Sequence, residues 1–192
     1  MNKPGHFDYD SDHVRLAGEL ILKSVGEDLN REGLQKTPHR FSKAIGEVCS
    51  GYGLTPELAV GEGIFPAEGK GLVSVKDISF FSLCEHHMLP FWGEVSVAYY
   101  PNDKIVGLSK IPRLVEVFAK RLQVQERLTN QVAHSLFNLI QPRAVAVKIL
   151  GCHMCMMMRG VKKTGSETLT EFALGMENLT QDETSRMWKS ID

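Results

Sequence analysis

Residues 72–101, LVSVKDISFFSLCEHHMLPFWGEVSVAYYP, carry the clearest structural signal in the chain. On both sides of a polar centre, apolar residues alternate with polar ones at the period of two that is typical of β-strands. The pattern predicts strands over 72–83 and 93–101, with Val95, Val97 and Tyr99 on one face. A short third strand is expected in KIVGLS, residues 104–109. The stretch therefore predicts the beginning of an antiparallel sheet.

On the C-terminal side of this stretch the sequence changes to the helical period. Ser109 is expected to cap a helix that has Pro112 in its first turn and an apolar stripe reaching Leu122. A second helix is expected over 125–140. Two further strands are expected, at 144–150 and 166–174.

On the N-terminal side, two helices and a long connection are expected. The first helix follows the Asp10 start signal and covers 11–29. The second has Thr37 as its N-cap and Pro38 at its first position, and ends before the glycines near residue 51. Residues 53–71 are rich in Gly, Pro and Glu and show no clear period, so a long loop is expected there.

The predicted order is two helices, a group of strands, two helices and a final pair of strands. This order favours the α+β class with an antiparallel sheet over a doubly wound parallel sheet. A small open sheet leaves edge strands unpaired, so we expect another subunit to cover them and the protein to be a homo-oligomer. The polar tail from Met176 is expected to form a loose surface helix with Trp188 as its only large anchor.

Composition narrows the class of protein. The chain has 192 residues, 43% of them hydrophobic, which fits one domain. The chain has 22 Lys and Arg and 23 Asp and Glu, so its net charge is close to zero. The protein as a whole therefore has no excess positive charge that would attract nucleic acid or an anionic membrane. The sequence shows neither a signal peptide nor an apolar run that could span a bilayer, so a cytoplasmic protein is expected. Four cysteines are too few for a disulfide scaffold and are expected as thiols or metal ligands: Cys49, Cys84, Cys152 and Cys155.

Two clusters of cysteine and histidine, CEHH at 84–87 and CHMC at 152–155, each follow an apolar strand. If the second segment stays extended, His153 and Cys155 point to one face and Cys152 to the other. The adjacent histidines of the first cluster also point in different directions. We therefore expect one metal site with the ligands Cys84, His87 and Cys155, flanked by the unliganded His86 and His153.

This donor set favours zinc. Thiolates and imidazole suit zinc better than magnesium or manganese, with ferrous iron as the alternative metal. Three protein ligands leave a fourth position for water, and such a water can attack an electrophilic carbon while a nearby histidine moves protons. Hydrolysis is the expected class of reaction. The competing interpretation is a structural Cys₂His₂ site that uses His86 or His153 as its fourth ligand.

Several basic residues lie where an anion could bind. Ser109, Lys110 and Arg113 are expected at a helix N-terminus, whose free N–H groups favour negative charge. Arg159 and Lys162 follow the second cluster. This placement fits a substrate with phosphates, and the simpler interpretation of each basic residue is that it is solvated.

Gln125 and Glu126 are expected to begin the helix over 125–140. A carboxylate there can accept paired N–H bonds from a planar ring with adjacent donors, as guanine has on its Watson–Crick edge. The alternative is a glutamate that only favours the helix dipole.

Three segments together resemble the GTP cyclohydrolase I family: SLCEHHMLPFWGEVSVAYYP, VGLSKIPRLVEVFAKRLQVQERLT and HMCMMMRGVKKTGSETLT. The resemblance runs from about Leu34 to Gly175. It implies the tunnelling fold, a ββααββ unit with helices on one face of its antiparallel sheet, assembled into a ring-stacked homodecamer with active sites between subunits. On this basis the chain divides into an N-terminal helical segment (1–33), a tunnelling-fold cyclohydrolase domain (34–175) and a polar C-terminal tail (176–192).

The resemblance also implies a reaction and a set of roles. GTP is hydrated at C8 with the help of zinc, the imidazole ring opens, C8 leaves as formate, and rearrangement of the ribose precedes closure to 7,8-dihydroneopterin triphosphate, the first step of tetrahydrofolate or pterin synthesis. By motif, Cys84, His87 and Cys155 bind Zn²⁺, and His86 and His153 transfer protons while Ser109 lies by the ribose. Gln125 and Glu126 hold guanine, and the triphosphate is held by Lys110, Arg113, Arg159 and Arg40, the last from another subunit. The resemblance assigns no role to Cys152.

Two alternatives to the complete reaction stay open at this point. An enzyme of the same kind could stop early, opening GTP to a formamide or removing formate without forming the pterin ring. A zinc-stabilised oligomeric protein could instead hold purines or pterins without converting them, and its metal would then have all four positions filled by protein.

Overall fold

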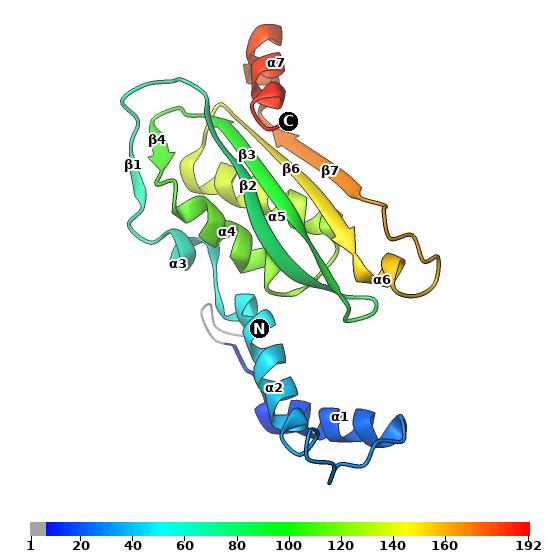
Figure 1. Ribbon diagram of the computed structural model, residues 1–192. Coiled ribbons are helices and arrows are strands. Elements are labelled where there is room, and N and C mark those ends of the chain that lie inside the picture. Colours follow the sequence, from blue (N-terminus) through cyan, green and yellow to red (C-terminus); the bar gives the residue numbers. More distant parts are fainter. Residues whose placement is uncertain (1–6) are drawn as a thin grey trace.

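A five-stranded sheet in the order β5-β2-β3-β6-β7 forms the centre of the fold (Figure 1). The computed structural model describes residues 7–192. Neighbouring strands are antiparallel, except that the short strand β5 runs parallel to β2. The strands are β2 (Val73–Cys84), β3 (Pro90–Tyr100), β5 (Leu122–Gln123), β6 (Ala144–His153) and β7 (Thr168–Leu174). The prediction of an α+β fold with an antiparallel sheet is confirmed. The short parallel strand β5 was not predicted.

The helices α4 (Lys110–Ala119) and α5 (Gln125–Ile140) cover one face of this sheet (Figure 1). Val95, Val97 and Tyr99 of β3 point to that face, and each is at most 1% exposed. They share one core cluster with Leu128 and Val132 of α5. Full burial of such an aliphatic side chain contributes about 1.5–3 kcal/mol. The core therefore fixes the start of α5 relative to the ends of β2 and β6.

Helix α4 is shorter than the apolar stripe predicted. It ends at Ala119, and Leu122 lies in β5 instead of on the helix. The chain leaves the helix because residues 122–123 pair with Leu83 and Cys84 at the end of β2. The prediction that the stripe reaches Leu122 is wrong for this reason.

The helices α1 (Ser11–Ser24) and α2 (Thr37–Val48) form an arm that projects from the sheet (Figure 1). Asp10 caps α1, accepting from the His13 backbone N–H at 2.9 Å. The predicted extension of α1 to residue 29 is wrong, because Gly26 adopts φ +84°, which ends the helix. Thr37 is the first helical residue and not the N-cap, because a preceding turn already engages its backbone N–H with Leu34 O.

Residues 53–71 are not one long loop. They contain the helix α3 (Pro56–Val60), capped by Thr55, and the strand β1 (Ile64–Pro66), which pairs with β4 (Lys104–Val106); the turn η1 (Ser50–Gly53) precedes them. Elements of three to five residues show no sequence period, so the pattern could not reveal them.

The C-terminal tail packs against the opposite face of the sheet. It contains the turn η2 (Met176–Asn178) and the helix α7 (Gln181–Lys189), which begins with a capping box of Thr180 and Glu183. Met187 and Ile191 are 0% and 2% exposed and form a second core cluster with residues of β3 and β6. The expectation that Trp188 is the only large anchor is therefore wrong.

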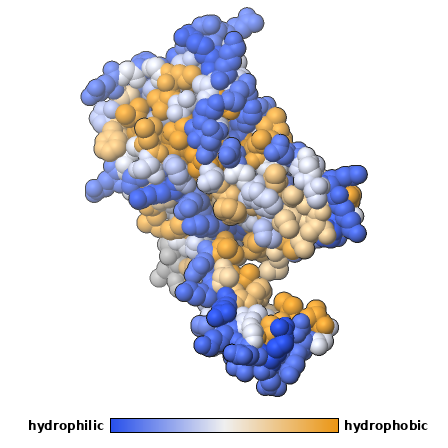
Figure 2. Space-filling model, viewed as in Figure 1, coloured by the Kyte–Doolittle hydropathy of each residue, from blue (hydrophilic) through white to orange (hydrophobic). Residues whose placement is uncertain are grey.

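Apolar groups also remain on the surface. Figure 2 shows them both over the sheet and on the helical arm. They include Phe81 of β2, which is 72% exposed, and Leu20 and Ile21 of α1, each 54% exposed. Within residues 7–192, none of the helices has the length and apolar character needed to span a membrane.

Candidate active site

A cavity of about 210 Å³ lies where the ends of β2 and β6 meet the start of α5. Residues from both cysteine and histidine clusters line it, together with the first residues of α5. Its walls include Cys84, His86, Gln125, Glu126, His153 and Cys155. The fold thus brings together six of the predicted site residues from three separate segments. Cavities that enclose small ligands typically measure about 300–1,000 Å³, so this cavity, which is open to solvent, is smaller than usual for such a site.

Cys84, His87 and Cys155 form a cluster in which one ligand atom from each lies within 4.8 Å of the others. Strand β2 ends at Cys84, and a tight turn closed by Met88 N donating to Cys84 O at 2.8 Å brings the chain back. His87 Nδ1 therefore lies 3.8 Å from Cys84 Sγ. These are the three residues that we expected to bind a metal.

Cys155 reaches the cluster by a different route from the one predicted. Strand β6 ends at His153, and α6 (Met154–Met157) follows it as a short helix. The assumption that the chain stays extended through Cys155 is wrong, because the helical turn carries its thiol toward Cys84. Cys152 pairs with Trp92 of β3 and lines a separate cavity, as expected for the opposite strand face.

The chemistry of the cluster fits a thiophilic cation. Burial, together with the neighbouring Cys84, raises the pKa of the Cys155 thiol. Two thiolates this close repel one another unless a cation lies between them, so the arrangement is suited to a bound metal. Two cysteines and one histidine match the ligands of catalytic zinc sites that keep an open position.

Two further histidines flank the cluster. The His86 ring is edge-on to that of His87, with centroids 6.2 Å apart, and its side chain is mainly exposed. His153 stacks flat on Phe91, with ring centroids 4.7 Å apart. Burial lowers the pKa of His153, against the opposing charge of Glu126, so its imidazole is neutral at pH 7. A neutral imidazole can accept a proton.

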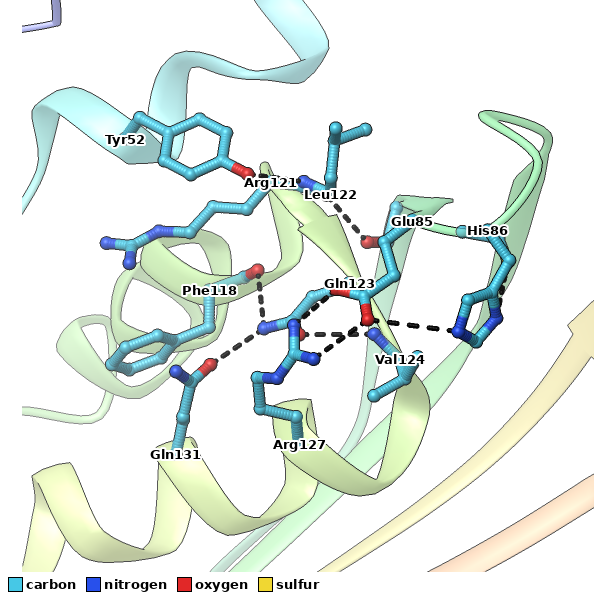
Figure 3. A network of polar contacts seen from close by, with 12 residues as sticks. Tyr52, Glu85, His86, Phe118, Arg121, Leu122, Gln123, Val124, Arg127 and Gln131 are labelled. Atoms are coloured by element: carbon cyan, nitrogen blue, oxygen red, sulfur yellow. Dashed lines mark hydrogen bonds and ion pairs between the residues drawn. The ribbon is translucent and has the colours of Figure 1, made fainter.

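A polar network behind the cavity holds the CEHH turn against α5 (Figure 3). Glu85 lies between two site residues and accepts two bonds from the Arg127 guanidinium, at 2.6 and 2.9 Å. These bonds lower the pKa of the Glu85 carboxyl. The Glu85 N–H donates to Gln123 O at 3.0 Å, and the Gln123 amide is itself bonded to Phe118 O and Gln131. Sequence reasoning missed these residues, although Glu85 and Arg127 each adjoin a predicted site residue.

Other predicted site residues lie elsewhere in the described chain. Arg159 Nη1 donates to His87 Nε2 at 3.1 Å, so it lies beside the metal cluster. Four residues do not line the cavity: Ser109, Lys110 and Arg113 around the start of α4, and Arg40 in α2. One chain therefore gathers the predicted metal and base groups but not all of the predicted phosphate groups.

Comparison with known proteins gives a consistent result. A family model described as GTP cyclohydrolase I matches residues 15–192, which extends beyond the similarity noted over 34–175. The GTP cyclohydrolase 1 of Deinococcus radiodurans is 53% identical over 155 residues, covering 81% of this chain and 72% of that protein. The GTP cyclohydrolase 1 of Leptospira biflexa is 54% identical over 158 residues, covering 82% of this chain and 86% of that protein.

Among solved structures, the archaeosine synthase QueF-Like in the apo form covers 56% of this chain and 97% of its own, at 19% identity and a TM-score of 0.48. A likeness of that size carries no argument about function.

Proposed function

The chain belongs to the GTP cyclohydrolase I family, and from this membership we propose that it is a zinc enzyme that converts GTP and water to 7,8-dihydroneopterin triphosphate and formate. The observation that carries the proposal is the cluster of Cys84, His87 and Cys155, whose two cysteines line the same cavity as His153 and Glu126. Hydrolysis at C8 of guanine needs a metal site, a group that accepts a proton and a carboxylate that binds the guanine ring. The cluster, His153 and Glu126 can supply these three functions.

The protein residues have separable roles in this proposal. Glu126 is exposed at the first turn of α5, where its carboxylate accepts from N1–H and the 2-amino group of guanine. The neutral His153 accepts a proton from the attacking water, and His86 supplies or removes protons on the more exposed side. When bound to Cys84, His87 and Cys155, zinc supplies Lewis acidity and an activated water.

We also propose that a neighbouring subunit completes the site in a ring-forming homo-oligomer, a decamer by the family resemblance. Three observations support this. The cavity of about 210 Å³ is smaller than is usual for a site that encloses a small ligand, no strand within residues 7–192 pairs with the outer edge of β7, and four expected substrate residues lie outside the cavity. Ser109, Lys110, Arg113 and Arg40 would then come from adjacent chains, while Arg159 lies at the cluster.

The division of the chain follows from the same proposal. Residues 34–175 contain the sheet and every residue of the cavity, so they form the catalytic unit, with the N-terminal segment 1–33 and the tail 176–192 serving assembly. The unpaired thiols among the ligands suit a reducing compartment such as the cytoplasm. A product with this chemistry serves the synthesis of folates or other pterins.

Incubating purified, zinc-loaded protein with GTP tests the proposal, with the nucleotide pool followed by mass spectrometry. The expected product has the mass of GTP plus water minus formic acid and becomes fluorescent as a pterin after oxidation. The mass of GTP plus two waters minus formic acid, or that of GTP plus one water with formate retained, would mean that the reaction stops before the pterin ring closes. Unchanged GTP would favour the alternative of a binding protein.

A further inference from the structure

Gln125 is buried at the start of α5, and the protein itself engages its side-chain amide. The residue is 1% exposed. Its Nε2 donates to Thr168 O at 2.8 Å, and to Ile149 O and Thr170 Oγ1 at 3.1 Å. Its Oε1 lies 2.9 Å from His153 Nε2. These partners occupy both hydrogens of the amide nitrogen as well as the amide oxygen, which leaves the side chain poorly placed to recognise a base.

The partners also fix the direction of each hydrogen bond. The backbone oxygens of Ile149 and Thr168 can only accept, so the amide nitrogen must face them and the amide oxygen must face His153. An amide oxygen cannot donate, and His153 must therefore carry its hydrogen on Nε2.

Neighbouring hydroxyls agree with this assignment. The Thr129 hydroxyl donates to Gln125 O at 2.8 Å, so the Thr170 hydroxyl, 2.7 Å away, donates to Thr129. Thr170 Oγ1 is then left as an acceptor for the Gln125 amide. Every donor in the group has an acceptor only when the amide has this orientation.

We propose that Gln125 is a positioning residue that holds His153 in the tautomer protonated at Nε2, so that Nδ1 is the nitrogen that exchanges protons with the substrate. Gln125 is thus not the contact to guanine that the family resemblance suggested, and that role falls to Glu126 alone. The inference deepens the proposed function and rests on it for its catalytic meaning. The tautomer itself can be measured without any reaction.

Two neighbouring residues, Gly151 and Phe91, favour the hydrogen bond between Gln125 and His153. A Cβ on Gly151 would lie 2.4 Å from Gln125 Oε1, so glycine at that position is what lets the amide reach His153. The imidazole also lies flat on Phe91, with an interplanar angle of 2°. The ring is therefore held by stacking on its face and by Gln125 at its edge.

Kinetics of Gln125→Met separate positioning from base binding. Methionine keeps the length of the side chain but cannot accept from Nε2, so kcat should fall by about 10²-fold, the lower end of what general acid–base catalysis contributes. KM for GTP should change by less than about threefold, because no substrate contact is removed. Thr170→Val is the matched control: it removes one acceptor of the same amide but leaves both carbonyls that orient it, so kcat and tautomer should be kept.

The independent readout is ¹⁵N NMR of histidine-labelled protein, with and without zinc, with the His153 signals assigned from His153→Gln. The expected result is a protonated Nε2 and an unprotonated Nδ1 in wild type, with loss of this preference in Gln125→Met. If Gln125→Met does not fold, Gly151→Ala should displace the amide and give the same change. The opposite tautomer in wild type, or a rise in KM at unchanged kcat in the variant, would overturn the inference. Wild-type protein that leaves GTP unchanged would defeat the proposed function, whereas the NMR result would still decide the tautomer.

Discussion

Cys152 and Cys155 are three positions apart in the sequence but face different surroundings. Only Cys155 lies in the cluster with Cys84 and His87, while Cys152 lines a cavity with Trp92 on the other strand face. We predict that Cys155→Ala loses its bound zinc and that the matched variant Cys152→Ala keeps about one zinc per chain. Metal analysis of the purified proteins by mass spectrometry measures this. Equal zinc content in the two variants would contradict the ligand assignment.

The paired bonds between Arg127 and Glu85 hold the turn that carries His86 and His87. Groups that orient metal ligands typically affect activity by about 10–100-fold, so Arg127→Ala should lower kcat by at least about tenfold. The melting temperature should change little, because both side chains are partly exposed to solvent, which weakens the contribution of an ion pair to stability. Arg31→Ala is the control, since it removes an Arg–Glu pair in the connection between α1 and α2, away from the site. Full activity of Arg127→Ala would show that the turn does not need this support.

The sequence predicted which residues belong to the site, but it did not predict which residues hydrogen-bond to them. Cysteine and histidine at the ends of two apolar strands predicted the cluster, because zinc sites are built from thiolates and imidazoles that separate segments bring together. The partners of Gln125 could not be predicted, because Thr168 and Thr170 are more than forty positions away and meet it only through the packing of α5 on β7. Glu85 and Arg127 meet for the same kind of reason.

Among the elements, α7 gives a direct test of how the tail is attached. Met187 is fully buried against Ala98 and Ala146 of the sheet. Met187→Ala should lower the free energy of unfolding by about 2–5 kcal/mol through lost burial and the cavity left behind. Lys189→Ala, on the exposed side of α7, should have little effect. Urea denaturation followed by circular dichroism compares them, and equal midpoints would mean that the tail is loose.

The start of α7 also makes stability depend on acidic pH. Hydrogen bonds from Arg143 and from Thr180 lower the pKa of Glu183 from 4.5 to about 2. A carboxyl with a depressed pKa stabilises the fold above its unfolded value and loses that effect as pH falls through its folded value. The difference in melting temperature between wild type and Glu183→Gln should therefore be full above pH 4.5 and shrink toward pH 2. A difference that does not vary over this range would contradict the linkage.

Element prediction succeeded where burial imposes a period over many residues. The strand β2 and the helix α5 bury one face and expose the other over much of their length, so their sequences alternate accordingly. The strand β3 is buried on both faces from Val95 to Tyr100 and was predicted from its apolar and β-branched residues. The elements missed were α3, β1, β5 and α6, which have two to five residues each. Their conformation depends on pairing with distant segments, and no local pattern records that pairing.

For the whole molecule, we predict that the active sites form between neighbouring chains. Glu126 lines the cavity of its own chain, whereas Arg113 does not line it. Glu126→Ala and Arg113→Ala should each be nearly inactive alone. If the two variants are unfolded and refolded together in equal amounts, about a quarter of the sites in mixed rings should hold both wild-type residues. Recovery of activity on this scale, measured against separately refolded controls, supports sites shared between chains. No recovery from the mixed rings would contradict the claim that Glu126 and Arg113 of one site come from different chains.

The most direct test of the central claim is to follow [8-¹³C]GTP by ¹³C NMR with protein that has been stripped of metal and then reloaded with zinc. The account predicts that the label leaves the nucleotide as formate, in step with the appearance of dihydroneopterin triphosphate, only after zinc is restored. Label that stays in GTP, or that stops in a formamide of the opened base, would contradict the claim that this site carries out the complete conversion.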